Sequence, residues 1–236
     1  MQEQLVKTSC AILTGVFVLL GFSARAQDLA NADCSLALAF ALDISTSVDD
    51  TEYELQRAGL AAALQDADVR TAIFSNGSPV MLMAYEWSGS NQQEVIAPWG
   101  IIADDADLSR FVAQVMGHTR KHNEFPTALG AAIGYGATML QRASSCARHV
   151  LDVSGDGANN HGYPPDSAYR HFPVAGITVN GLVIDTGDAS VVDYYLETVI
   201  HGPGAFVEIA LGFEDYEEAM KRKLLREIQA PQYAQR

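Results

Sequence analysis

Short apolar runs alternate along the chain with segments in which apolar residues recur at steps of three and four positions. These steps are clear at Leu108, Phe111, Val112 and Val115, and such spacing predicts an amphipathic helix. The short runs are bounded by turn-forming residues, which is typical of strands. They lie at residues 36–44, 80–87, 95–102, 149–153, 177–184 and 206–211.

Helical segments separate most of these runs, and we expect helices at residues 49–68, 108–116, 127–142, 192–200 and 214–228. Strands that alternate with helices favour a parallel sheet. Residues 88–91 are short enough for a hairpin between the second and third strands. We therefore predict an α/β fold: a doubly wound, mostly parallel six-stranded sheet with one antiparallel edge strand and helices on both faces.

Two features of these helices leave alternatives open. Gly130, Gly134 and Gly136 each weaken a helix by about 1 kcal/mol relative to alanine. Close packing against the sheet would explain them, and so would simple tolerance. The basic residues at 221–223 lie on the last helix, where we expect a solvated surface; a docking patch is the alternative.

The first 26 residues have the pattern of a secretory signal peptide. Lys7 precedes an apolar stretch at residues 11–22, and Ala24-Arg25-Ala26 has the small-x-small pattern of a cleavage site. An uncleaved anchor is the alternative, but a membrane span needs roughly 20 apolar residues. We therefore predict a signal peptide at residues 1–26, a single domain at residues 27–236, and export to the periplasm or the medium.

Composition and charge narrow the classes of partner. The chain has 236 residues, of which 48% are hydrophobic, and this fits one globular domain. Its 29 acidic and 15 basic residues give a formal net charge of −14. Such a charge repels phosphate backbones and anionic membrane surfaces, so we expect no nucleic-acid partner. Cleavage of the predicted signal peptide would leave no membrane span in the mature chain.

Cys34 and Cys146 are the two cysteines outside the predicted signal peptide. In an oxidising compartment such a pair is more often bridged than metal-bound. Two buried free thiols are the alternative.

Oxygen-bearing side chains follow two of the predicted strands. Asp43, Ser45 and Ser47 follow the first strand, and Asp156 stands in Ser-Gly-Asp-Gly after the fourth. Thr127 is placed at the predicted start of a helix. Ligands bind at the carboxyl ends of parallel strands, and oxygen ligands suit Mg²⁺ better than Zn²⁺. We expect Asp43 and Ser45 at the rim of the sheet, where alanine would remove metal affinity with little effect on the fold.

Helix capping is the alternative for these carboxylates and hydroxyls, because acids and serines at strand-to-helix turns often accept hydrogen bonds from free amides. Capping explains each loop singly but not the joint pattern.

Together the five residues resemble the metal-ion-dependent adhesion site (MIDAS) of the von Willebrand factor type A (vWA) domain. That site is built from Asp-x-Ser-x-Ser, a threonine and an aspartate on three loops, matched here by Asp43, Ser45, Ser47, Thr127 and Asp156. The resemblance covers nearly all of the predicted mature chain. Residues 152–160 are similar to an uncharacterised bacterial family of exported proteins with this domain.

The resemblance implies ligand roles and a disulfide. In such domains the serines usually bind the ion directly, the threonine directly or through water, and the aspartates mostly through water. The family topology places the first and fourth strands side by side. Cys34 lies nine residues before Asp43 and Cys146 ten before Asp156, so the resemblance implies a bridge between them.

The function that the resemblance implies is an exported protein-binding module in which Mg²⁺ or Mn²⁺ accepts a carboxylate from a protein partner. The second possible function is that of a structural scaffold that binds no metal. A Mg²⁺-dependent hydrolase is the third, with Asp43 as nucleophile or ligand, but Ser45 stands where common aspartate-nucleophile phosphatases have a second acid. No general acid or base completes such a set, and we expect no enzyme activity.

Two neighbouring segments have open roles. His118, Arg120, Lys121 and His122 form a basic stretch, which is either a solvated loop or an attractant for an acidic partner. The residues at 159–161 follow Asp156 and either orient waters or a partner, or merely shape a turn.

Overall fold

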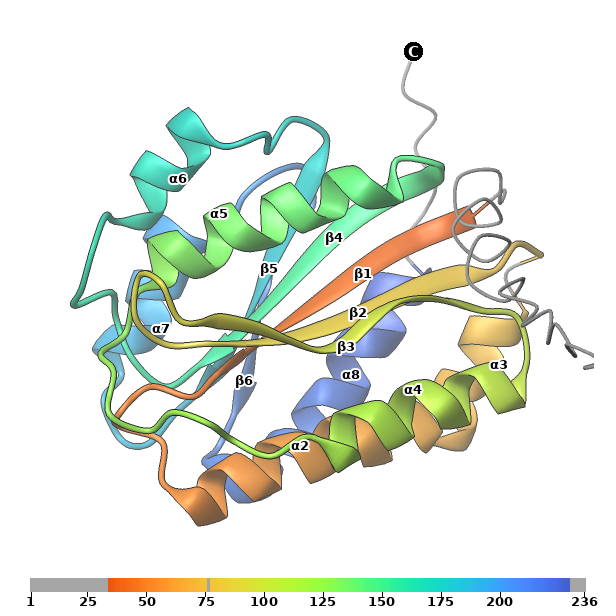
Figure 1. The fold of residues 1–236 in the computed structure, drawn as a ribbon, viewed down its shortest axis with the longest axis horizontal. Helices are drawn as coiled ribbons and strands as arrows, with labels where there is room; N and C mark the ends of the chain where they lie inside the picture. Colours follow the sequence, from red (N-terminus) through yellow and green to blue (C-terminus); the bar gives the residue numbers. More distant parts are fainter. Residues whose placement is uncertain (1–33, 76, 230–236) are drawn as a thin grey trace, which may run out of the picture.

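The computed structural model describes residues 34–75 and 77–229 (Figure 1). The predicted signal peptide at residues 1–26 lies outside the described residues. The strands are β1 (Cys34–Asp43), β2 (Val80–Trp87), β3 (Gln93–Ile102), β4 (Cys146–Gly155), β5 (Ile177–Ile184) and β6 (Val207–Ala210). The main helices are α2 (Asp50–Gln65), α3 (Ala67–Phe74), α4 (Asp105–Gly117), α5 (Leu129–Leu140), α6 (Pro165–His171), α7 (Ser190–Tyr194) and α8 (Tyr216–Gln229). A π-helix, η2 (Tyr195–Val199), continues α7, and short 3₁₀ turns, η1 (Gln141–Ala143) and η3 (Phe213–Asp215), follow α5 and precede α8.

The six strands form one sheet in the order β3-β2-β1-β4-β5-β6. β2, β1, β4, β5 and β6 are parallel, and β3 pairs antiparallel with β2 at one edge. This confirms the predicted fold class, including the hairpin and the antiparallel edge strand. β1 and β4 occupy the centre, so the two strands that carry the predicted acids lie next to each other.

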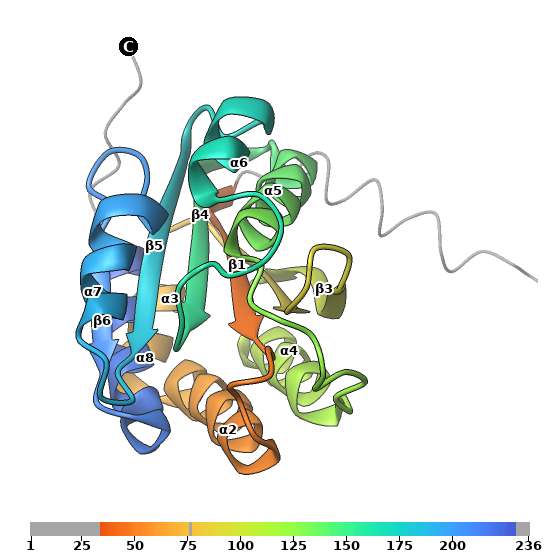
Figure 2. The same ribbon diagram turned by 90° about the vertical axis from the view of Figure 1, so that its left-hand side faces the viewer.

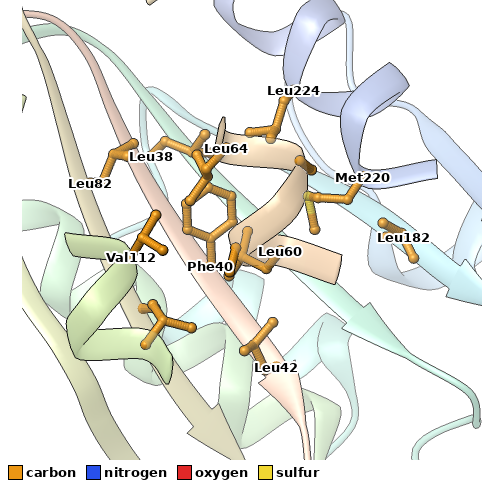
Figure 3. Close-up of a cluster of buried hydrophobic side chains, with 14 of the residues drawn as sticks. Leu38, Phe40, Leu42, Leu60, Leu64, Leu82, Val112, Leu182, Met220 and Leu224 are labelled. Atoms are coloured by element: carbon orange, nitrogen blue, oxygen red, sulfur yellow. The ribbon is translucent and has the colours of Figure 1, made fainter. Parts of the chain in front are cut away.

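Helices cover both faces of the sheet. α5 and α6 lie on one side, and α2 and α4 lie on the other (Figures 1 and 2). The alternation of side chains along β1 explains the two layers, because Leu38, Phe40 and Leu42 enter one core and the intervening alanines enter the other. Figure 3 shows the first core, in which Phe40 lies among leucines from α2 and α8. Every residue of β1 is buried, as expected for a central parallel strand.

Gly136 allows α5 to lie close to the sheet, whereas Gly130 and Gly134 make room for Tyr163 and Phe172 on the side of α6. A Cβ on Gly136 would lie 2.6 Å from both Leu151 Cδ1 and Tyr85 Oη, which real contacts do not reach. Of the two explanations for this glycine, the structure therefore supports close packing.

The disulfide predicted between Cys34 and Cys146 is present. The two cysteines are direct partners in the β1–β4 register, with their Cα atoms 4.3 Å apart. They lie at the start of their strands, so the bridge joins β1 and β4 at the opposite end of the sheet from Asp43 and Gly155.

The helix predicted at residues 49–68 is divided in two. Asp66 ends α2, and its carboxylate then accepts hydrogen bonds from Asp68 N at 2.8 Å and Val69 N at 3.4 Å to begin α3. The apolar spacing continues across this break, which is why periodicity alone did not reveal it. α6 was likewise not predicted.

The expectation of a solvated basic surface at 221–223 is wrong for Lys223. Its side chain is 0% exposed and lies 2.8 Å from Asp152 and 2.5 Å from Glu227. Burial raises the pKa of Asp152 to about 7, and the positive charge of Lys223 opposes that shift. The cluster therefore joins α8 to the centre of the sheet by buried charges rather than by apolar contacts alone.

Among the residues that the structure describes, no helix combines the length and the apolar composition that a membrane crossing requires.

Candidate metal centre

The first loop of the candidate site begins where β1 ends. Asp43 is 0% exposed, and its Oδ1 accepts a hydrogen bond from Ser45 N at 2.7 Å, which turns the chain after the strand. Gln56 of α2 holds the same turn by donating to the Asp43 carbonyl at 2.9 Å. Within the described chain, Asp43 Oδ2 is buried and accepts no hydrogen bond. One carboxylate oxygen is thus available to a further ligand.

The hydroxyls of the site form a continuous chain. Ser45 Oγ lies 3.2 Å from Ser47 Oγ and accepts from Thr127 Oγ1 at 3.2 Å. Ser47 Oγ donates to Asp156 Oδ1 at 2.7 Å. The fold thus brings together all five residues that the sequence singled out.

Burial within the site differs from the expectation. Asp43 and Ser45 are fully buried at its base rather than at the rim, because the first two residues after Asp43 still lie beneath the neighbouring loops. Ser47 is exposed and Asp156 is partly buried, so these two residues form the solvent side.

Thr127 is positioned by the loop that carries Asp156. The side-chain Oδ1 of Asn160 accepts a hydrogen bond from Thr127 N at 2.9 Å, and the backbone N–H of Asn160 donates to the Thr127 carbonyl at 3.0 Å. Asn159 accepts from Gly130 N at 3.2 Å. α5 begins at Leu129, so Thr127 precedes the helix rather than opening it. Asn159 and Asn160 thus join the loop that carries Asp156 to the segment that begins α5.

Arg120 is the residue of the basic stretch that the sequence interpretation placed incorrectly. Its side chain is only 6% exposed and donates to the carbonyls of Ile44 at 3.0 Å, Val48 at 2.8 Å and His122 at 2.8 Å. Lys121 forms an ion pair with Glu94. His118 is also mainly buried, whereas the side chains of Lys121 and His122 are exposed, so the solvated-loop expectation holds for part of the stretch. Arg120 fixes the loop that contains the two serines.

The capping alternative does not account for the site. Asp49 caps α2, accepting from Thr51 N at 2.7 Å and Glu52 N at 2.8 Å, and Glu52 completes the capping box. α5 begins after Ala128, which has no capping side chain. Asp43 instead accepts a hydrogen bond from Ser45 N, and Asp156 accepts one from Ser47 Oγ. The negative charges of the two carboxylates also repel each other.

The electrostatics of the site favour a cation. Burial and, after it, the negative charge of Asp156 raise the pKa of Asp43 to about 8, against the hydrogen bonds from Ser45, which lower it. Burial also raises the pKa of Asp156, opposed by the hydrogen bond from Ser47. A divalent cation at this point would offset both effects, and the two carboxylates and three hydroxyls fit Mg²⁺ or Mn²⁺. Within residues 34–75 and 77–229 there is no group of three or more His, Cys, Asp or Glu side chains that could hold a metal.

This fold, with an acid-and-serine loop after its first strand, is that of the vWA class of domains. Proximal thread matrix protein 1 from the mussel byssus is 13% identical with a TM-score of 0.61, over 82% of this chain and 48% of that chain. A von Willebrand factor type A protein from Catenulispora acidiphila is 14% identical with a TM-score of 0.61, over 83% of this chain and 43% of that chain. The chain thus spans about half the length of these two proteins or less. An aerotolerance-related membrane protein from Bacteroides fragilis is 14% identical with a TM-score of 0.52, over 80% of this chain and 98% of that chain.

Within this class the chain belongs to the family described as "Protein of unknown function (DUF1194)", whose sequence profile matches residues 33–232. No curated protein sequence matches the chain. One structure of the mussel protein has a zinc-occupied MIDAS motif. The vWA-like identity predicted from the five residues is thus confirmed for the fold. That these five residues bind a metal ion stays a prediction.

Proposed function

We propose that the protein is an exported, divalent-metal-dependent protein-binding module whose site consists of Asp43, Ser45, Ser47, Thr127 and Asp156. The observation that carries this proposal is the hydroxyl chain of Ser45, Ser47 and Thr127, which joins three loops and ends on Asp156. Any single one of these hydrogen bonds could simply stabilise a turn. The joint arrangement gathers oxygen ligands from distant segments around two acids.

The residues of the chain have distinct roles in this proposal. Ser45, Ser47 and Thr127 would hold the ion by their hydroxyl oxygens, and Asp43 and Asp156 would hold its coordinated waters. The ion, Mg²⁺ or Mn²⁺, would supply an open coordination position for a carboxylate of a protein partner. Exposed Ser47 and partly exposed Asp156 place that position on the solvent side.

An adhesion-type role fits this geometry better than hydrolysis. Asp43 would be the nucleophile of a hydrolase, yet it is 0% exposed and its Oδ1 already accepts from Ser45 N. A substrate would have to reach it beneath Ser45. Export is supported by the predicted signal peptide and by the Cys34–Cys146 disulfide, which is typical of oxidising compartments.

The test is thermal unfolding of residues 27–236 with Mg²⁺, Mn²⁺, Zn²⁺ or EDTA. A ligand at roughly 100 times its Kd stabilises a protein by about 2.7 kcal/mol, so binding raises the Tm. Asp43→Asn keeps the shape of the side chain and should lose the increase. Asp68→Asn is the matched control, because Asp68 is 75% exposed on α3, away from the carboxyl end of β1 (Figure 1). If none of the ions changes the Tm of the wild-type chain, the scaffold reading is favoured.

A partner test follows once an ion is found. Immobilised wild-type protein should retain an envelope protein in the presence of the ion and release it in EDTA. Ser47→Ala should retain none. Equal retention in EDTA would contradict a metal-dependent contact.

A further inference from the structure

Buried polar atoms of three residues meet beneath the metal centre. The side chains of Asp43, Trp87 and Tyr195 are each 0% exposed. Among the described residues, Asp43 Oδ2, Trp87 Nε1 and Tyr195 Oη have no hydrogen-bond partner. A Cβ on Gly155 would lie 2.6 Å from Tyr195 Oη, 2.8 Å from Asp43 Oδ2 and 3.4 Å from Trp87 Cζ2. The phenol and the free carboxylate oxygen therefore face the same point on the sheet.

Two glycines make the space in which the tyrosine ring lies. Gly155 ends β4, and Gly181 stands inside the neighbouring strand β5. A Cβ on Gly181 would lie 2.7 Å from Tyr195 Cδ1, and one on Gly155 would meet the phenol oxygen. Glycine weakens a strand interior, so its presence on both strands calls for a reason. Here both glycines leave room for the ring and the hydroxyl of Tyr195.

The backbone at Tyr195 is also unusual. Tyr195 opens the π-helix η2, and Ile200 N donates to the Tyr195 carbonyl at 3.1 Å across five residues. Such wide turns are rare and are frequent at functional sites. A phenylalanine would fill the same space without burying a hydroxyl, so the hydroxyl itself requires an explanation.

In the described structure the phenol O–H and Asp43 Oδ2 lie near the same point without a hydrogen bond between them. We propose that Tyr195 is a positioning residue of the metal centre, whose phenol O–H donates to Asp43 Oδ2 when an ion is held and so orients the carboxylate toward the ion. Trp87, the register partner of Asp43 on β2, lines the same space. This inference rests on the proposed function, because orientation of Asp43 matters only where an ion is held. It extends the site to η2, from which none of the five predicted ligands comes.

Tyr216 provides a matched control. It is also 0% exposed, but its hydroxyl has a partner, Ser154 Oγ at 2.9 Å, and its ring belongs to the other core of the sheet. Tyr195→Phe and Tyr216→Phe therefore remove the same atom from two equally buried tyrosines, one facing the metal centre and one not.

The experiment measures two quantities for each variant: the Kd of Mn²⁺ by titration calorimetry, and the Tm in EDTA. Tyr195→Phe should weaken Mn²⁺ binding about tenfold, the effect of losing a hydrogen bond to a charged group, with an unchanged or higher Tm in EDTA. Tyr216→Phe should lower the Tm in EDTA and leave the Kd unchanged.

The outcomes separate the two proposals. If the wild-type chain binds Mn²⁺ and Tyr195→Phe binds it equally well, the role of Tyr195 is overturned and the proposed function stands. A parallel loss of affinity and of Tm in EDTA would show a merely structural tyrosine, and would also overturn the role. If the wild-type chain binds no metal ion, the proposed function fails, and this inference fails with it.

Discussion

Ser47 Oγ donates a hydrogen bond of 2.7 Å to Asp156 Oδ1, although the two residues lie 109 positions apart in the chain. The contact closes the site on its solvent side, above buried Asp43 and Ser45. It joins the loop after β1 to the loop after β4, which are neighbouring strands of the sheet. The first prediction tests this contact.

Ser47→Ala should abolish the metal-induced rise in Tm and change the stability in EDTA little. Ser47 is exposed, so its removal creates no buried cavity, and surface substitutions usually stay within about 0.5 kcal/mol. Thr71→Ala is the control, since Thr71 is an exposed hydroxyl residue on α3. Thermal unfolding with and without Mn²⁺ measures both effects. A full metal response in Ser47→Ala would remove this hydroxyl from the ligand set.

Arg120→Ala should reduce both stability and metal affinity. Arg120 donates to four backbone carbonyls, and removal of buried charged donors costs about 1–3 kcal/mol for each acceptor left unpaired. Three of these carbonyls, those of Ile44, Ser45 and Val48, belong to the loop that carries the serines, so its geometry should loosen. Arg120→Lys should not restore affinity, because the compact ammonium group cannot reproduce the planar fork of donors by which the guanidinium reaches carbonyls on two loops.

The control for this experiment is Arg110→Ala. Arg110 is 53% exposed and pairs only with Asp107 in the described structure. It should leave denaturant unfolding and metal titration unchanged. Unchanged metal affinity in Arg120→Ala would show that the loop keeps its geometry without the arginine.

The sequence was sufficient to predict the sheet, and to single out five residues that the fold brings together, because both depend on local patterns. Apolar runs mark buried strands, and the ends of parallel strands must meet at one edge of the sheet. The pattern Asp43-x-Ser45-x-Ser47 is continuous in sequence, so it could be recognised before its neighbours were known.

The residues that support the site were missed because their roles depend on contacts across the fold. Arg120 looked like a solvated basic residue, and only the packing of two loops shows that its donors are occupied. Lys223 was predicted to lie on a solvated surface for the same reason, because its buried ion pairs with Asp152 and Glu227 are visible only in the folded chain. Tyr195 belongs to a regular helical spacing of apolar residues, so the sequence offered no reason to single it out. Gly181, a glycine within an apolar strand, was the one signal, and it can be interpreted only when the strands are aligned and Tyr195 is seen to pack against it.

Loss of the Cys34–Cys146 disulfide should destabilise the protein without changing metal affinity. The bridge closes a segment with a sequence separation of 112 residues, and a loop of that size stabilises by up to about 4.7 kcal/mol through the unfolded state. Because the bridge lies at the opposite end of β1 from Asp43, the site should keep its geometry. Denaturant unfolding of a Cys34→Ser/Cys146→Ser variant measures the loss. Reductant should destabilise the wild type and leave this variant unaffected, whereas equal stability of the two oxidised proteins would contradict the prediction.

Lys223→Met should lower the free energy of unfolding by about 3–5 kcal/mol at neutral pH, as expected when one partner of a buried ionic cluster is removed. The change leaves Asp152 and Glu227 buried together without their cation. Lys221→Met is the control on the same helix, since Lys221 is partly exposed and pairs with Asp66. Urea unfolding at neutral pH compares the two. Equal small losses would show that the buried charges are not coupled.

The stability of the metal-free protein should fall as pH rises between about 4 and 8. The pKa of Asp43 is raised from 3.8 to about 8 in the folded protein, so across this window the folded state keeps a proton that the unfolded state has lost. Each such proton lowers the free energy of unfolding by up to about 1.4 kcal/mol per pH unit. Asp152, with a pKa of about 7, contributes a slope of the same sign.

Asp43→Asn should remove the contribution of Asp43 to the pH dependence of the free energy of unfolding and leave the contribution of Asp152. Asp152→Asn should remove the contribution of Asp152. A bound divalent ion favours the ionised carboxylate, so the metal-induced rise in stability should grow with pH over the same window. Urea unfolding of the three proteins between pH 5 and 8, in EDTA and in Mn²⁺, measures these slopes. An identical slope in Asp43→Asn and the wild type would mean that Asp43 is already ionised in the metal-free protein. The growth of the metal response with pH would then have to come from Asp156, whose pKa burial also raises.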